Sequence, residues 1–154
     1  MYTRLYQNIL NRFPFVASAN VFNSFYNTTG VFGLYGAAPA TEMGSLVAGL
    51  VDEAKKMKGA ISDVELSRAK NMLKASLLMN LESRPILFED IGRQVLTYGT
   101  RAEPGELVAK IEKVTAADLN KVATDLLKSP PSIVVHGDTT SVPRYDLIAK
   151  ALAA

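Results

Sequence analysis

Charged side chains gather around a proline in the segment 77–96, LLMNLESRPILFEDIGRQVL. They are Glu82, Arg84, Glu89 and Asp90, on either side of Pro85. Carboxylates at the start of a helix interact favourably with the positive end of its dipole, by about 0.3–1 kcal/mol each. On an exposed surface the same groups can instead capture and orient a basic peptide. The residues alone favour the first interpretation, because Arg84 and Arg93 are placed to pair with these acids.

Residues that could hold a metal are scarce. His136 is the single histidine and cysteine is absent, whereas a catalytic zinc is typically held by histidines spaced as in H-E-x-x-H. The chain also lacks G-x-S-x-G, a P-loop and G-x-G-x-x-G, so nucleophile-elbow hydrolysis and phosphate binding have no scaffold. His136 follows the apolar run 133–135 and is typical of a strand end. We expect no metal site and no cofactor in this chain.

Composition indicates one packed domain over residues 1–154. Apolar residues make up 48% and charged residues 21% of the chain, both near the values of globular proteins. Seventeen basic and 15 acidic side chains leave a formal charge of +2 without a basic stripe, so nucleic acid is not an expected partner. The longest apolar run, 46–54, is interrupted by charges and is far shorter than the ~20 residues of a membrane-spanning helix.

The spacing of apolar residues predicts the elements that position these groups. A helix is expected over 2–12 with Leu5 and Ile9 on its inner face, followed by a hairpin of 16–26 and 31–37 around the turn 27–30. Gly33 and Gly36 in the second strand indicate a bulge or a close approach by a helix. A further helix is expected over 41–58, capped by Thr41 and packing through Leu46.

Helix-start signals divide the second half of the chain. The spacing of Ser62 and Glu65 predicts a capping box for a long helix, which Pro85 breaks or kinks before a second piece running to 98. Pro104 begins the next helix, and Thr115 with Asp118 begins another. A strand over 132–137 and a helix from 143 complete the prediction of an α+β fold. Three strands are few for so many helices, so we expect further strands from upstream sequence or another chain.

Four segments resemble one peptidase family. MNLESRPILFEDIGRQVL, MYTRLYQNILNR, YNTTGVFGLY and DVELSRAK together resemble the C-terminal half of the alpha subunits of mitochondrial processing peptidases, which belong to the pitrilysin-like peptidases. This resemblance spans nearly the whole chain. It implies an α+β unit with a mostly antiparallel sheet covered by helices, and a partial domain at 1–154 that is incomplete at its N-terminus. In the family, a mobile glycine-rich loop precedes the position of Met1.

The resemblance also implies a function without catalysis. Alpha subunits are inactive homologues of a zinc peptidase, and the zinc belongs to a beta-type partner. Acidic residues that recognise basic presequence peptides in the family match Glu65, Glu89 and Asp90 here. Related subunits form the core of respiratory complex III, so the implied location is the matrix side of the mitochondrial inner membrane, with other complex III subunits as partners. A purely structural core protein is the alternative, and an autonomous peptidase is the least favoured hypothesis.

Overall fold

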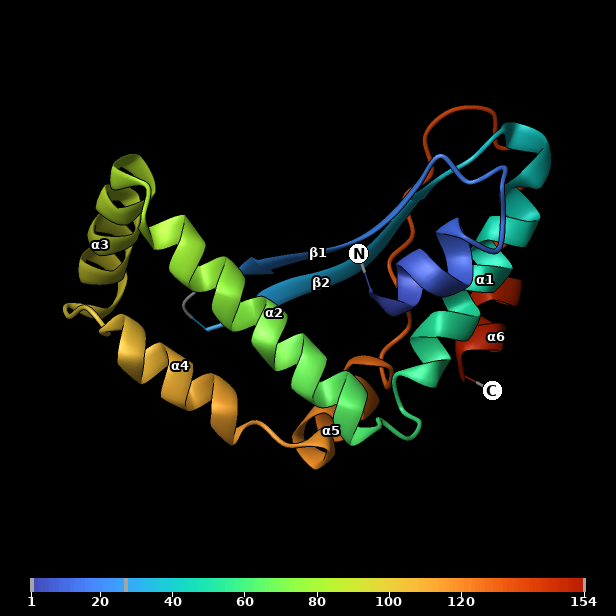
Figure 1. Cartoon of the computed structure of the whole chain (residues 1–154). Helices are drawn as coiled ribbons and strands as arrows, with labels where there is room; N and C mark the ends of the chain where they lie inside the picture. Colours follow the sequence, from blue (N-terminus) through green and yellow to red (C-terminus); the bar gives the residue numbers. More distant parts are fainter. Residues whose placement is uncertain (1, 27, 154) are drawn as a thin grey trace. The chain divides into compact units, whose positions relative to one another are not determined.

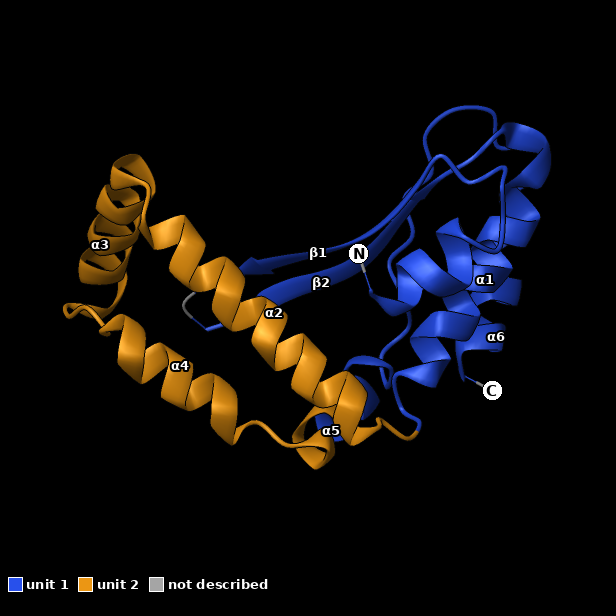
Figure 2. Cartoon of the chain, in the orientation of Figure 1, with its two compact units in different colours: residues 1–59, 120–154 blue, residues 60–119 orange. Residues whose placement is uncertain are grey.

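The structure, a computed structural model, describes residues 2–26 and 28–153. Within this range, helices accompany a two-stranded antiparallel sheet, and the predicted α+β class is confirmed. The chain forms two compact units, one of Met1–Gly59 with Asn120–Ala154 and the other of Ala60–Leu119 (Figure 2). The boundary between the two units falls within helix α5 (Ala116–Leu126).

The first unit contains the predicted hairpin. Strand β1 (Ser18–Phe25) pairs antiparallel with β2 (Gly30–Ala37), in a register that runs from Ser18 opposite Ala37 to Phe25 opposite Gly30 (Figure 1). The backbone N–H of Tyr26 donates to the carbonyl of Thr29 at 2.8 Å, which closes the connection. Asn27, part of the predicted turn, lies outside the described residues.

Both strand glycines leave room for a neighbouring side chain. A Cβ at Gly36 would lie 3.0 Å from Leu46 Cδ2 and 3.1 Å from Leu50 Cδ1, both in helix α1 (Met43–Lys56). Gly33 lies opposite Phe22, whose ring occupies the space that a Cβ would need. Of the two predicted explanations, a close approach by a helix therefore applies to Gly36, whereas at Gly33 the close neighbour is an aromatic ring of the other strand.

The core of the first unit forms where α1 meets β2 and the N-terminal helical segment. Residues 4–10 of that segment are helical, with a π-helix at Tyr6–Leu10, and they bury Leu5 and Ile9 as predicted. Leu46 of α1 is only 1% exposed and joins this cluster. Helix α6 (Tyr145–Ala153) packs against α1 and buries Ile148. The inner positions predicted for Leu5, Ile9 and Leu46 are thus confirmed.

Two helix boundaries and one strand are predicted wrongly. Thr41 does not cap α1; it lies in a 3-10 turn (Ala40–Glu42), and the residue before α1, Glu42, makes no side-chain cap bond. The last helix begins at Tyr145 and not at Pro143. Residues 132–137 form no strand, because a strand needs a neighbour for its backbone groups and within the described residues β1 and β2 pair only with each other. Val134 in this segment is 94% exposed.

The second unit is helical. Helices α2 (Asp63–Leu81), α3 (Arg84–Tyr98) and α4 (Pro104–Lys113) follow one another, and α2 contacts both of the others. Pro85 lies in the first turn of α3, where its missing N–H leaves no helical bond unmade, so the predicted break is confirmed. Pro104 likewise begins α4 as predicted. Gly99, in a left-handed conformation with φ of 74°, ends α3.

Apolar side chains of the second unit are unusually open to solvent. All residues of Ala60–Leu119 are described, and none of them is buried. Leu96 is 89% and Phe88 81% exposed, both on α3. Leu73 of α2 is 56% exposed. Three helices that bury so little apolar surface gain little from the hydrophobic effect on their own.

Candidate functional site

Glu65 lies in the first turn of α2, where Ser62 caps the helix. The backbone N–H of Glu65 donates to Ser62 Oγ at 3.2 Å, so the predicted capping relation is confirmed in this direction. A cap of this kind contributes about 0.5–2 kcal/mol to a helix. The position of Glu65 therefore has a structural explanation that does not require a peptide.

Glu89 is paired within its own helix. Arg93, four residues later in α3, donates to Glu89 Oε1, as the sequence suggested for this arginine. Both side chains are well exposed, Glu89 at 64% and Arg93 at 72%. Exposed pairs at this spacing contribute only about 0.3–0.5 kcal/mol to a helix. The pair nevertheless neutralises much of the charge that Glu89 would present to a ligand.

Asp90 has a different environment from its neighbour. Gln94 Nε2 donates to Asp90 Oδ2 at 2.8 Å, and Gln94 Oε1 accepts from the backbone N–H of Ala102, also at 2.8 Å. Both hydrogen bonds are partly buried. A neutral amide thus holds Asp90 and fastens the turn after α3 to the helix. The carboxylate keeps its net charge because its partner carries none.

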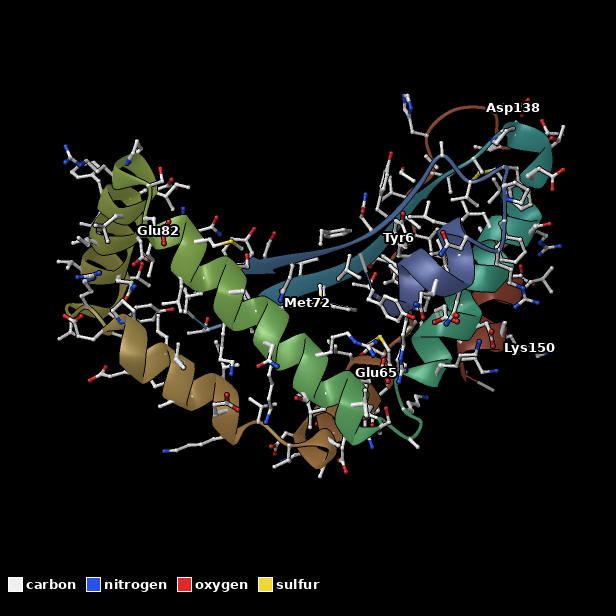
Figure 3. All side chains as sticks on the ribbon, viewed as in Figure 1. Tyr6, Glu65, Met72, Glu82, Asp138 and Lys150 are labelled. Carbon is white, nitrogen blue, oxygen red and sulfur yellow. The ribbon has the colours of Figure 1, made fainter. Side chains whose placement is uncertain are left out.

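The three predicted site residues do not converge on one place. Glu89 and Asp90 are neighbours in α3, whereas Glu65 lies at the opposite end of α2 from the α2–α3 junction. Figure 3 shows Glu65 and Glu82 at the two ends of that helix, with Met72 between them. At 1.5 Å per residue, Glu65 and Glu82 are separated by about 25 Å along the axis. Any peptide that touched both Glu65 and the acids of α3 would have to extend along α2.

Two lysines of α2, Lys70 and Lys74, connect this helix to α4. Lys70 Nζ donates to the carbonyl of Glu112 at 2.8 Å, near the C-terminal end of α4, and Lys74 pairs with the Glu112 carboxylate. The hydrogen bond from Lys74 lowers the pKa of Glu112 below its ordinary value. Cations at a helix C-terminus also complement its dipole.

The donor set does not fit a zinc site. No group of three or more His, Cys, Asp or Glu side chains in residues 2–26 and 28–153 is arranged to hold a metal ion. His136, the single histidine, lies in the irregular segment before Gly137. In the same range, no helix is long and apolar enough to cross a membrane.

Two polar side chains make contacts that sequence reasoning did not predict. Gln94 is one, although its spacing of four residues from Asp90 is a pattern typical of side-chain contacts on a helix. The other is Glu53, which is 4% exposed and accepts from Asn8 Nδ2 at 3.0 Å and from Lys56 Nζ at 2.9 Å. Asn8 and Glu53 are far apart in sequence, so no local pattern signals that contact.

Comparison with known proteins shows which peptidase subunits the chain resembles. Residues 1–73 match the family model described as "Peptidase M16 inactive domain". All 154 residues align at 38% identity with the mitochondrial-processing peptidase alpha subunits of Bos taurus and Homo sapiens, and 151 residues at 39% with that of Solanum tuberosum. The chain is therefore similar over its whole length to part of these alpha subunits, and its residues 1–73 are similar to an M16 domain. The resemblance to pitrilysin-like alpha subunits is confirmed.

The matched M16 proteins are much longer than this chain, which covers 29% of the Bos taurus and Homo sapiens subunits and 30% of the Solanum tuberosum subunit. The fold is also that of a solved structure, "Complex III2 from Candida albicans, Inz-5 bound". That match has a TM-score of 0.73 at 23% identity and covers 81% of this chain and 30% of the other. It supports the α+β arrangement of an M16 C-terminal unit.

Proposed function

We propose that this chain is a non-catalytic alpha-type subunit of a mitochondrial processing peptidase, contributing to the recognition of presequence peptides. The supporting observation is the 38% identity with mitochondrial-processing peptidase alpha subunits over every residue of the chain. The match to an inactive M16 domain agrees with a role other than cleavage. The proposed location is the mitochondrion, on the matrix side of the inner membrane.

Catalysis in this proposal belongs to a beta-type partner. The described residues of this chain do not fit a zinc site, so no step of peptide hydrolysis is assigned to them. The chain would contribute binding surface, and the partner would supply the metal and the base. Other complex III subunits are further proposed partners, since the fold of this chain recurs in a complex III structure.

The proposed peptide contacts are Glu65, Glu89 and Asp90. Carboxylates on an exposed helix attract arginine side chains, and such contacts mainly speed capture and set orientation. Glu89 and Asp90 share the first half of α3, which makes this helix the more favourable contact. Glu65 would meet a different part of the peptide, because it lies at the other end of α2.

A second candidate is a purely structural core protein of complex III. The open apolar side chains of the second unit, among them Phe88 and Leu96, favour it, because extensive exposed apolar surface is usually covered in an assembly. Under this alternative Glu89 and Asp90 would only stabilise α3 through their contacts within that helix.

Peptide binding separates the two candidates. The full chain, assembled with a zinc-bearing beta-type subunit, is titrated into a fluorescent arginine-containing presequence peptide and followed by anisotropy. We expect Glu89→Gln/Asp90→Asn to weaken binding about 2- to 10-fold, the loss of two partly exposed charge contacts. Glu106→Gln, an exposed acid in the first turn of α4, is the matched control and is expected to leave affinity unchanged.

Salt provides a second measurement on the same complex. Contacts between exposed charges are screened beyond about 8 Å at physiological ionic strength, so wild-type affinity should fall as salt rises. Equal affinity of wild type and the double variant, together with a flat salt response, would favour the structural core protein.

A further inference from the structure

Gln94 joins two groups that the sequence does not connect. Its Nε2 donates to Asp90 Oδ2 and its Oε1 accepts from Ala102 N, each at 2.8 Å. The backbone N–H of Ala102 can only donate, so the amide oxygen must face it and the amide nitrogen must face Asp90. The orientation of Gln94 is therefore determined by its partners on both sides.

This arrangement leaves Asp90 with one oxygen available. Oδ2 is occupied by Gln94, and no hydrogen bond reaches Oδ1 from any described residue. Because the Asp90–Gln94 contact is partly buried, a cation approaching Oδ1 would be screened less than one approaching a fully exposed acid. Gln94 thus fixes the orientation of the carboxylate through Oδ2, and Oδ1 can still accept a hydrogen bond.

Glu89 differs from Asp90 in its partner, which is charged, and in its exposure, which is greater. Its carboxylate is bound by the guanidinium of Arg93 and is 64% exposed. A peptide arginine would have to displace Arg93 before it could pair with Glu89, and it would meet two mobile, hydrated side chains. The two adjacent acids are therefore unequal as contacts for a cation.

We propose that Gln94 is a positioning residue that presents the Asp90 carboxylate to an arginine of a bound peptide. This inference rests on the proposed function and adds a residue that positions one of its proposed peptide contacts. Gln94 acts through Asp90 and does not itself touch the peptide guanidinium.

The test uses two peptides and the assembled complex described above. One peptide carries arginine and the other carries citrulline at the same position, which removes the charge and keeps the shape. The measured quantity is the ratio of the two dissociation constants. We expect Asp90→Asn and Gln94→Leu each to reduce this ratio by about three- to tenfold, as expected when a charged contact is lost or no longer preorganised. Glu106→Gln, the matched control in the first turn of α4, should leave it unchanged.

A double-variant cycle excludes a merely structural effect of Gln94. If Gln94 acts through Asp90, adding Gln94→Leu to Asp90→Asn should reduce the ratio no further. If Gln94 only holds the turn at Ala102, Gln94→Leu should weaken the binding of both peptides equally. Its effect on affinity should then add fully to that of Asp90→Asn, and this result would overturn the proposal. Gln94→Asn, whose shorter amide cannot span both partners, is expected to repeat the result if leucine disturbs folding.

Failure of this inference is distinguishable from failure of the proposed function. A wild-type complex that does not discriminate arginine from citrulline overturns both. Discrimination that persists in Gln94→Leu overturns only the role of Gln94 and leaves presequence recognition in place.

Discussion

Two glycines illustrate how surroundings decide the effect of one added carbon. Gly36 in β2 faces Leu46 and Leu50 at close contact, whereas Gly92 in α3 has no neighbouring atom within 4 Å of the position that a Cβ would take. The first glycine makes room for a helix. At Gly92, by contrast, no neighbouring atom requires the absence of a side chain.

Substitution at these positions should change stability in opposite directions. Gly36→Val crowds the two leucines and is expected to lower the free energy of unfolding by about 1–3 kcal/mol. Gly92→Ala adds no contact and is expected to raise it by about 0.5–1 kcal/mol, because alanine loses less backbone entropy in a helix. Urea denaturation of the full chain measures both. Equal effects of the two variants would contradict the packing at Gly36.

Individual residues were predictable from sequence where the contact is local. Ser62 with Glu65 and Thr115 with Asp118 follow a three-residue rule for helix starts, and both contacts are present. Glu53 was not predictable as a buried acid, because its partner Asn8 comes from a distant helical segment. The charge that a candidate site residue presents depends on such partners, as the difference between Glu89 and Asp90 shows.

At the scale of elements, the attachment of α2 to α4 should be sensitive to acid. Hydrogen bonding to Lys74 lowers the pKa of Glu112 in the folded chain. Its contribution to stability is therefore present above the ordinary glutamate pKa of about 4.3 and is lost as pH falls through the lower pKa of the folded state. The pair contributes at neutral pH and not in strong acid.

Lys74→Met tests this dependence, since methionine keeps the apolar stem and removes the charge. We expect the variant to unfold more easily than wild type at about pH 7 and the difference to shrink at about pH 2, as the pH falls through the lowered pKa of Glu112. Denaturation curves at the two pH values measure it. A difference that is constant with pH would show that Lys74 stabilises the unit by packing alone.

Helices could be predicted where the sequence itself marks their first turn. Pro85 and Pro104 each place a helix start correctly, because the ring fits the first turn and no later one. The segment 132–137 has the composition of a strand but forms none, since strand formation depends on a neighbouring strand and not on the segment itself.

At the scale of the whole molecule, the two units differ in how they are stabilised. The first has a cluster of buried side chains around Ile9 and Leu46, whereas no residue of Ala60–Leu119 is buried. The 154-residue chain with these open apolar faces covers 29% of the length of its Bos taurus relative. Further strands from upstream sequence or another chain stay a prediction. The pattern of apolar residues predicted the fold class, but it carries no information on which faces a partner covers.

The central claim is that this chain assists cleavage without holding the catalytic ion. Zinc content is its most direct measure, determined by elemental analysis of the isolated chain and of a beta-type partner after dialysis against metal-free buffer. We predict stoichiometric zinc in the partner and none retained by this chain, because its described residues offer no ligand set. Tightly held, stoichiometric zinc in the isolated chain would contradict the claim.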